Sequence, residues 1–281
     1  MAGKLYVVGT PIGNLGDFSP RAIEILRSVD FVAAEDTRVT GKLMNHFEIH
    51  QPMLSYYEHN KAGRGNQILS RLMAGETCAV VSDAGLPAIS DPGEDLVRLC
   101  HENGVLVESV PGPCALVTAL SISGMPSGRF TFEGFLSVNK PSRRAHLAEL
   151  TEEKRTMIFY EAPHKLLATL RDMLEAFGDR PIALVRELTK IHEQVQRTTF
   201  SRAISFYEEN PPRGEFVLIV EGRKEEKTEL SEQQALALAR QFLAEGDSPS
   251  AAAKKAAAVS GCRKGELYKM LIGMGEKNQN E

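Results

Sequence analysis

The sequence predicts an α/β fold of two domains followed by a small helical extension. The chain has 281 residues, and at roughly 100–200 residues per domain this length favours two domains. Short apolar runs alternate with amphipathic segments through most of the chain, which is the pattern of a sheet with helices on its faces. Residues 231–274 are rich in alanine and show only helical patterning.

The first domain is expected over residues 1–122. Its first helix has a clear start, because Ser19 can cap it and Pro20 suits the first helical position. Other helices are expected at 40–47, 67–73, 94–102 and 115–122, and strands at 5–8, 31–34, 79–82 and 105–110.

The segment Ser-Gly-Met-Pro-Ser-Gly at 123–128 is rich in residues that break helices and strands, and it predicts the domain boundary. The second domain is expected over 129–222, with helices at 144–150 and 166–177 and strands at 130–135, 156–160, 182–185 and 216–220. The charged run 223–227 reads as a linker, and the helical tail is expected over 229–275.

The composition excludes several classes of protein. The net charge of −4 argues against a broadly basic nucleic-acid binder, although a local basic patch is compatible with it. The four cysteines form no C-x-x-C pair, so we expect neither a disulfide framework nor a metal site, and a reducing cytoplasm fits best. No apolar run approaches the ~20 residues that span a bilayer, so we expect no membrane contact.

A glycine-rich loop at 9–17 follows the first predicted strand. Its spacing is G-x-x-x-G-x-x-G, and no Lys-Ser or Lys-Thr follows, so it matches neither the phosphate loop of nucleotide hydrolases nor the dinucleotide fingerprint. The loop fits two interpretations, a tight turn between strand and helix or one wall of a ligand site.

A second loop, 82–93, follows another buried strand and is dense in Gly, Pro and Asp. A tight turn needs about four residues, whereas this loop uses twelve. A third turn, Pro-Gly-Pro-Cys-Ala at 111–115, leads from strand into helix. Ligands of open α/β sheets bind at the carboxyl ends of the strands, so three such turns favour a cofactor cleft there.

Five segments, taken in order, resemble motifs of the tetrapyrrole methylase superfamily, and within it the group that methylates small-subunit ribosomal RNA. They are VGTPIGN, AEDTR, SDAGLPAISDPG, VPGPCA and YEAPH, and the similarity runs from about Lys4 to Gly222. The superfamily more often has Gly-Asp-Pro where this chain has Ser82-Asp83-Ala84. The aspartate is kept, but the resemblance does not define the path of the loop around it.

The resemblance implies a two-domain, tetrapyrrole-methylase-like α/β fold, with a parallel sheet in the first domain and a mixed sheet in the second. It implies a cytoplasmic homodimer that binds S-adenosylmethionine between the domains and needs no metal. The implied reaction is 2′-O-methylation of a cytidine in the decoding centre of 16S rRNA, within the small ribosomal subunit. Carried over by motif, the implied cofactor-binding residues are Ile12, Asp83, Leu86, Cys114, Ala115 and Tyr160. Ordinary loop packing is the alternative for Leu86, Cys114 and Ala115.

Transfer to a ribose hydroxyl would benefit from a nearby base, because this hydroxyl is a poor nucleophile at neutral pH. The catalytic candidates are Glu35, Asp36 and Arg38 of AEDTR and His164 of YEAPH, with Arg186 and Glu187 as further candidates. Two alternatives stay open at this point. Asp36 and Arg38 also fit a structural ion pair, and His164 also fits a helix cap.

The tail is locally basic. Residues 251–270 hold five lysines and arginines against one glutamate. Ala257, Gly261 and Leu267 have the spacing of a helix-turn-helix, in which cations would contact RNA phosphates. A plain two-helix extension is the alternative. Lys140, Arg143 and Arg144 are expected to form a second exposed basic cluster.

Two other functions compete with RNA methylation. One is methylation of a small tetrapyrrole or another non-RNA acceptor, which would require a deep apolar cleft and no basic tail. The other is a non-enzymatic ribosome-binding protein, in which the glycine loops are only structural. Binding of S-adenosylhomocysteine, detected as a thermal shift, separates the enzyme from the second alternative.

Overall fold

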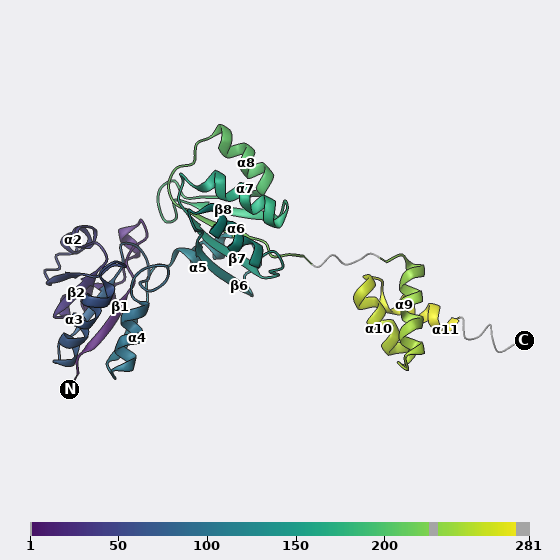
Figure 1. Cartoon of the computed structure of the whole chain (residues 1–281), viewed down its shortest axis with the longest axis horizontal. Coiled ribbons are helices and arrows are strands. Elements are labelled where there is room, and N and C mark those ends of the chain that lie inside the picture. The colour runs from purple at the N-terminus through teal and green to yellow at the C-terminus, as the bar shows by residue number, and fades with distance from the viewer. Residues whose placement is uncertain (1, 225–229, 274–281) are drawn as a thin grey trace, which may run out of the picture. The chain divides into compact units, whose positions relative to one another are not determined.

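The computed structural model describes residues 2–224 and 230–273. Its contacts divide the chain into two compact units, Met1–Arg223 and Lys224–Glu281. The first unit contains two sheets, and the second contains helices (Figure 1). Most of the expected linker at 223–227, and the two ends of the expected tail at 229 and 274–275, lie outside the described residues.

The first sheet is parallel and has the strand order β3-β2-β4-β1-β5. Strand β1 lies inside the sheet, where Leu5 pairs with Cys78 on one side and Val107 on the other. Burial on both faces explains why β2 and β4 are continuous apolar runs. The strands are β1 (Lys4–Val8), β2 (Phe31–Ala34), β3 (Met53–Ser55), β4 (Cys78–Val81) and β5 (Leu106–Val110).

Four helices cover the two faces of this sheet. Helices α1 (Pro20–Ser28) and α2 (Thr37–His46) bury Leu26 and Met44 in one core cluster. Helices α3 (Lys61–Met73) and α4 (Glu94–Glu102) contribute Ile68, Leu72, Leu96 and Cys100 to a second cluster. The carboxyl ends of the strands between these two layers carry the loops that concern function.

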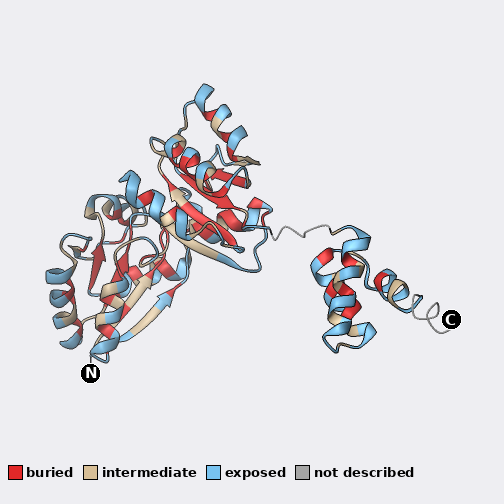
Figure 2. Cartoon of the chain, turned by 45° about the vertical axis from the view of Figure 1, so that its right-hand side comes forward, coloured by how far each residue is buried: buried red, intermediate tan, exposed pale blue. Residues whose placement is uncertain are grey.

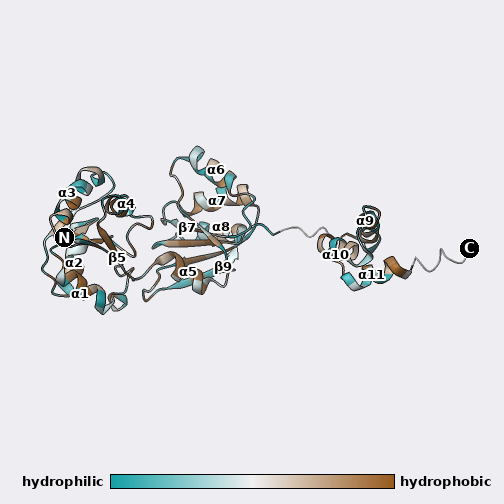
Figure 3. Ribbon diagram, turned by 90° about the horizontal axis from the view of Figure 1, so that it is seen from below, coloured by the Kyte–Doolittle hydropathy of each residue, from teal (hydrophilic) through white to brown (hydrophobic). Residues whose placement is uncertain are grey.

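The second sheet is mixed and has the order β6-β7-β10-β8-β9. Strand β6 pairs in parallel with β7, and the other neighbours are antiparallel. The buried strands are red in Figure 2 and hydrophobic in Figure 3. The strands are β6 (Phe130–Phe135), β7 (Thr156–Glu161), β8 (Pro181–Arg186), β9 (Gln194–Thr199) and β10 (Phe216–Val220).

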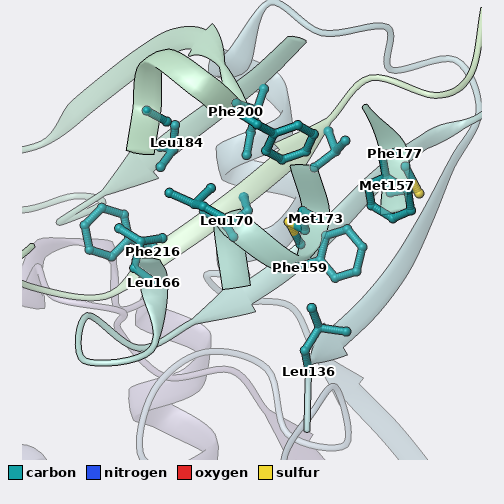
Figure 4. Close-up of a cluster of buried hydrophobic side chains, with 14 of the residues drawn as sticks. Leu136, Met157, Phe159, Leu166, Leu170, Met173, Phe177, Leu184, Phe200 and Phe216 are labelled. Carbon is teal, nitrogen blue, oxygen red and sulfur yellow. The ribbon is translucent and has the colours of Figure 1, made fainter. Parts of the chain in front are cut away.

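One face of the second sheet packs under α6 (Lys140–Glu149), α7 (Leu166–Phe177) and α8 (Phe200–Glu209). Figure 4 shows this core, in which Leu170 and Met173 of α7 lie among Phe159, Phe200 and Phe216. Complete burial of these large side chains supplies much of the driving force for folding, at roughly 1.5–3 kcal/mol for each.

Helix α5 (Ala115–Ser123) covers the other face of the second sheet. Its Leu116 and Leu120 pack with Ile158 and Val185. The boundary expected at residues 123–128 follows α5 in the chain, whereas the packing of α5 groups it with the second sheet. Residues 111–114 therefore carry the chain from one sheet to the helix on the other.

The C-terminal unit consists of α9 (Glu232–Ala244), α10 (Pro249–Ser260) and α11 (Lys264–Gly273). Alanines let the helices approach closely, and Leu267 is buried among them. Gly261 ends α10 in the left-handed conformation, with φ of 74°. A short turn thus joins α10 to α11, as the spacing of these residues predicts.

The predicted fold class is confirmed, but some elements differ from prediction. Helices α3 and α6 begin earlier than predicted, at Lys61 and Lys140. In α6 the early start is possible because Pro141 lies in the first turn, where a backbone N–H would have no partner within the helix. Apart from a single 3-10 turn at Leu15–Asp17, three elements were not predicted: the three-residue strand β3, the polar strand β9 and helix α8. The two strands lie at sheet edges, where one neighbour is enough and the sequence pattern is weak.

Candidate active site

The two glycine-containing loops at the carboxyl end of the first sheet are joined directly. Thr10 donates its backbone N–H to the Gly85 carbonyl at 2.8 Å, and Gly85 returns one to the Thr10 carbonyl at 3.1 Å. The Thr10 hydroxyl also donates to the Ser82 carbonyl at 3.2 Å. The loops at 9–17 and 82–93 therefore form one surface.

Gly9 and Gly112 bring the third turn against the first loop. A Cβ on Gly9 would lie 2.7 Å from the Gly112 Cα, and one on Gly112 would lie 2.8 Å from the Gly9 Cα. Only glycine permits this approach of two backbones. All three loops thus meet at one edge of the sheet.

The long loop carries uncommon backbone conformations. Ala88 and Ser90 have φ of 67° and 63°, and in the segment after β8 Glu187 and Thr189 have φ of 53° and 66°. These are four of the five non-glycine residues with positive φ in the described chain. Such strain is retained where the surrounding structure holds it, often at functional sites.

A cavity of about 360 Å³ lies between these loops and the second sheet. Its volume is within the range of about 300–1,000 Å³ typical of ligand pockets. All six residues with implied cofactor roles line it, namely Ile12, Asp83, Leu86, Cys114, Ala115 and Tyr160. Of the catalytic candidates, Glu35 and Glu187 line it. Asp36, Arg38, His164 and Arg186 are not among its lining residues.

Glu35 and Asp83 tie the ends of neighbouring strands together. The Asp83 backbone N–H donates to Glu35 Oε2 at 3.2 Å, and the Asp36 N–H donates to Asp83 Oδ1 at 3.0 Å. Burial raises the pKa of both carboxyl groups above their ordinary values. The pocket therefore has acidic groups on its first-sheet side.

The ion pair between Asp36 and Arg38 is present. The Arg38 Nε donates to Asp36 Oδ1 at 3.0 Å and its terminal nitrogen to Oδ2 at 2.6 Å. Asp36 Oδ1 also accepts the Arg38 backbone N–H at 2.8 Å, which caps α2. The hydrogen bonds from Arg38 lower the pKa of Asp36 to about 2, so this carboxylate is a weak base.

Tyr160 connects the pocket to α5. Its hydroxyl accepts the backbone N–H of Leu116 at 3.0 Å, and this bond satisfies an amide in the first turn of a helix that lacks a side-chain cap. Burial raises the pKa of Tyr160 above its ordinary value. Phe132 and Phe135 meet the Tyr160 ring edge to face, with centroids 5.0 and 5.4 Å away.

Among the lining residues that were not singled out from the sequence, two have notable chemistry. Phe135 ends β6 and is 55% exposed, and the Lys165 Nζ lies 5.6 Å from its ring centroid. Asp91 lies in the long loop, and burial with the nearby Glu35 charge raises its pKa to about 6. An aromatic residue at a strand end was a usable signal for Phe135. No sequence signal separates Asp91 from Asp83.

His164 is exposed on the turn after β7, whereas its neighbours Glu161 and Ala162 line the pocket. The expectation of an exposed cluster at Lys140, Arg143 and Arg144 is wrong for Arg143. This residue is only 8% exposed, and its Nε donates to Asp172 at 2.8 Å. Arg144 also pairs with Asp172, so this pair of arginines holds α6 against α7.

Among the described residues, no group of three or more His, Cys, Asp or Glu side chains is arranged to hold a metal ion. No helix within the described ranges is both long and apolar enough to cross a membrane.

Comparison with known proteins identifies the family. Residues 4–204 match the family Tetrapyrrole (Corrin/Porphyrin) Methylases. A protein of Synechocystis sp. named Ribosomal RNA small subunit methyltransferase I is 47% identical over 272 residues, which cover 96% of this chain and 98% of that protein. A relative of the same name from Thermotoga maritima is 48% identical over 222 residues, which cover 79% of this chain and 100% of that protein.

The fold has solved counterparts. The uroporphyrin-III-C-methyltransferase of Thermus thermophilus superposes with a TM-score of 0.56 at 21% identity, covering 78% of this chain and 94% of that one. At this identity the likeness shows the fold alone, and the sequence match carries the assignment. The chain belongs to the tetrapyrrole methylase family.

Proposed function

We propose that this chain transfers the methyl group of S-adenosylmethionine to the 2′-hydroxyl of a cytidine in the decoding centre of 16S rRNA. It is a methyltransferase that uses S-adenosylmethionine as methyl donor and small-subunit ribosomal RNA as substrate. The observation that carries the proposal is its identity of nearly one half with a ribosomal RNA methyltransferase over almost the whole of both chains. The choice of cytidine as the nucleotide and of the 2′-oxygen as the methylated atom goes beyond the name of that relative and is part of the proposal.

The pocket fits the methyl donor in size and chemistry. The side chains of Ile12, Leu86 and Ala115 give it an apolar wall for the adenosine and the carbon chain of the methionine part. Asp83 can accept a hydrogen bond from a ribose hydroxyl or an amino group. Because the donor carries a sulfonium charge, the carboxylates of Glu35 and Asp83 attract it more strongly than the neutral product. These residues would hold the donor and orient its methyl group toward the acceptor.

The decisive experiment offers methyl-labelled S-adenosylmethionine with naked 16S rRNA, 30S subunits, 70S ribosomes or a porphyrinoid, and then maps the label. We expect label on a ribose of the decoding centre in at least one RNA substrate. Label on a base would overturn the choice of atom. Label only on an added porphyrinoid would replace RNA methylation with the small-molecule alternative.

The assembly, the location and the role of the tail complete the proposal. We expect a homodimer in the cytoplasm, as the resemblance implies, and light scattering of the purified chain measures its mass. Lys254, Lys264 and Lys269 are exposed on the C-terminal unit and would contact RNA phosphates. Glu35 lines the pocket and would help to shape the donor site, whereas the ion pair of Asp36 and Arg38 supports a structural role for both.

A further inference from the structure

Carboxylates dominate the titratable groups of the pocket wall. A ribose hydroxyl needs a neighbouring base to become a good nucleophile near neutral pH. The described lining contains six carboxylates that could serve: Glu35, Asp83, Asp91, Glu161, Glu187 and Glu215. Their hydrogen-bond partners distinguish them.

The first two already hold backbone amides. Glu35 accepts the Asp83 N–H, and Asp83 accepts the Asp36 N–H. Protonation of either carboxylate would weaken a bond that joins the ends of β2 and β4. These groups are therefore better suited to shaping the pocket than to exchanging protons.

Two carboxylates on the second-sheet side pair with lysines. Glu161 lies 3.0 Å from the Lys165 Nζ and is only 2% exposed. Glu187 lies 3.0 Å from the Lys190 Nζ. Glu215 is exposed to solvent at the rim. None of these three combines a free carboxylate with shelter from water.

Asp91 combines both. It is half-buried three residues before the start of α4, and no cation or backbone amide of the described chain binds its carboxylate. The Ser82 hydroxyl lies near it, and Tyr160 faces it from the second sheet. The pKa of about 6 leaves the group ionised at neutral pH yet more basic than an ordinary aspartate.

We infer that Asp91 is the catalytic residue that accepts the proton of the ribose 2′-hydroxyl. This inference rests on the proposed function and names the base for it. The Asp91 carboxylate takes the proton as the ribose oxygen forms its bond to the methyl carbon. The methyl–sulfur bond breaks, its electron pair stays on sulfur, and the sulfonium becomes a neutral thioether. Asp91 then passes the proton to solvent.

The charges around Asp91 determine its pH dependence. Glu35 and Asp83 face it from the strand ends, and both raise its pKa by repulsion. Across the pocket the titratable groups are Cys114, Tyr160, Glu161, Glu187, Lys190 and Glu215. Because the three carboxylates of the first-sheet side interact, the fall in rate at low pH, called the acid limb here, has an apparent pKa that depends on all three. Replacing Asp91 should remove this limb, and replacing Glu35 should only move it.

The test measures single-turnover transfer against pH for the wild-type enzyme, Asp91→Asn, Asp91→Glu and Glu35→Gln. We expect the wild-type rate to fall as pH drops through about 6. Asp91→Asn should lose roughly 10²–10⁴-fold in rate together with the limb. Asp91→Glu should retain the limb, and Glu35→Gln should shift it to lower pH. Glu94→Gln removes an exposed charge three residues away and should leave the rate unchanged.

A second readout does not depend on activity. In the wild-type protein without ligands, an NMR titration of carboxyl carbons should show a group with a pKa near 6 that disappears in Asp91→Asn. Calorimetry should find S-adenosylhomocysteine bound to Asp91→Asn, which separates a folded inactive variant from a misfolded one. Wild-type rate and an unchanged limb in Asp91→Asn overturn this inference alone. A wild-type enzyme that labels no RNA overturns the proposed function and the inference together.

Discussion

Gly9 and Gly112 touch backbone to backbone where the first and third loops of the pocket meet. A Cβ on Gly112 would lie 2.8 Å from both the Cα and the carbonyl oxygen of Gly9. These are backbone atoms that cannot rotate away. The contact therefore fixes the distance between the two loops that present Ile12 and Cys114 to the pocket.

Gly112→Ala should separate these loops. We expect it to lower the free energy of unfolding by about 1–3 kcal/mol, the range for overpacking, and to weaken binding of S-adenosylhomocysteine. Thermal denaturation and calorimetry measure the two effects. Gly63→Ala is the matched control, because its Cβ would meet no atom within 4 Å. Wild-type stability and affinity in Gly112→Ala would contradict the contact.

Asp83 offers a way to separate charge from hydrogen bonding. Asp83→Ala removes both, and we expect it to weaken cofactor binding by roughly 10–150-fold, as for hydrogen bonds to charged groups. Asp83→Asn keeps an acceptor for the Asp36 N–H. It should therefore weaken S-adenosylmethionine more than S-adenosylhomocysteine, which lacks the sulfonium charge. If the calorimetric affinities of both variants for both ligands are unchanged, Asp83 does not bind the cofactor.

The strand-and-loop framework could be predicted because its signals are local. Continuous apolar runs mark β2 and β4, and Gly, Pro and Asp mark the long loop between β4 and α4. The roles of the acidic side chains could not be predicted in this way. Asp83 and Asp91 lie in the same loop, and only tertiary contacts show that the first accepts a backbone amide while the second does not.

The misassigned arginine has a similar explanation. Arg143 lies in a polar helix whose sequence gives no sign of burial. Its partner Asp172 is 29 residues away on α7. Pairing across that distance is a property of helix packing, so the sequence predicted an exposed basic cluster where the structure has a buried ion pair.

Tyr160 should contribute to stability through one hydrogen bond. Tyr160→Phe leaves the Leu116 N–H without its acceptor, and we expect a loss of about 1 kcal/mol in the free energy of unfolding. The effect should appear as a lower melting temperature with the ring packing kept. Tyr57→Phe, at an exposed position, is the control. Equal melting temperatures for both variants would contradict a structural role of the Tyr160 hydroxyl.

The C-terminal unit should affect RNA binding and not cofactor binding. A chain ending at Arg223 keeps the whole first unit, and we expect it to bind S-adenosylhomocysteine normally and RNA weakly. The logarithm of RNA affinity falls linearly with the logarithm of salt concentration. Replacing Lys254, Lys264 and Lys269 by alanine in the full chain should make this slope less steep by about 2–3. Filter binding over a salt series measures this slope. An unaltered slope would show that these lysines do not contact phosphates.

Asp91 should also affect stability in a pH-dependent way. Its pKa rises from 3.8 to about 6 in the folded chain, so the native state binds more protons than the unfolded state between these values. Stability attributable to the protonated group is present below about pH 4 and is lost as the pH rises through about 6. Asp91→Asn does not titrate, so it should be more stable than wild type near pH 8 and should lose this advantage near pH 4. Urea denaturation of both proteins at the two pH values measures the difference. If the substitution changes the free energy of unfolding equally at both pH values, Asp91 has the pKa of an ordinary aspartate, and this result would weaken its assignment as the base.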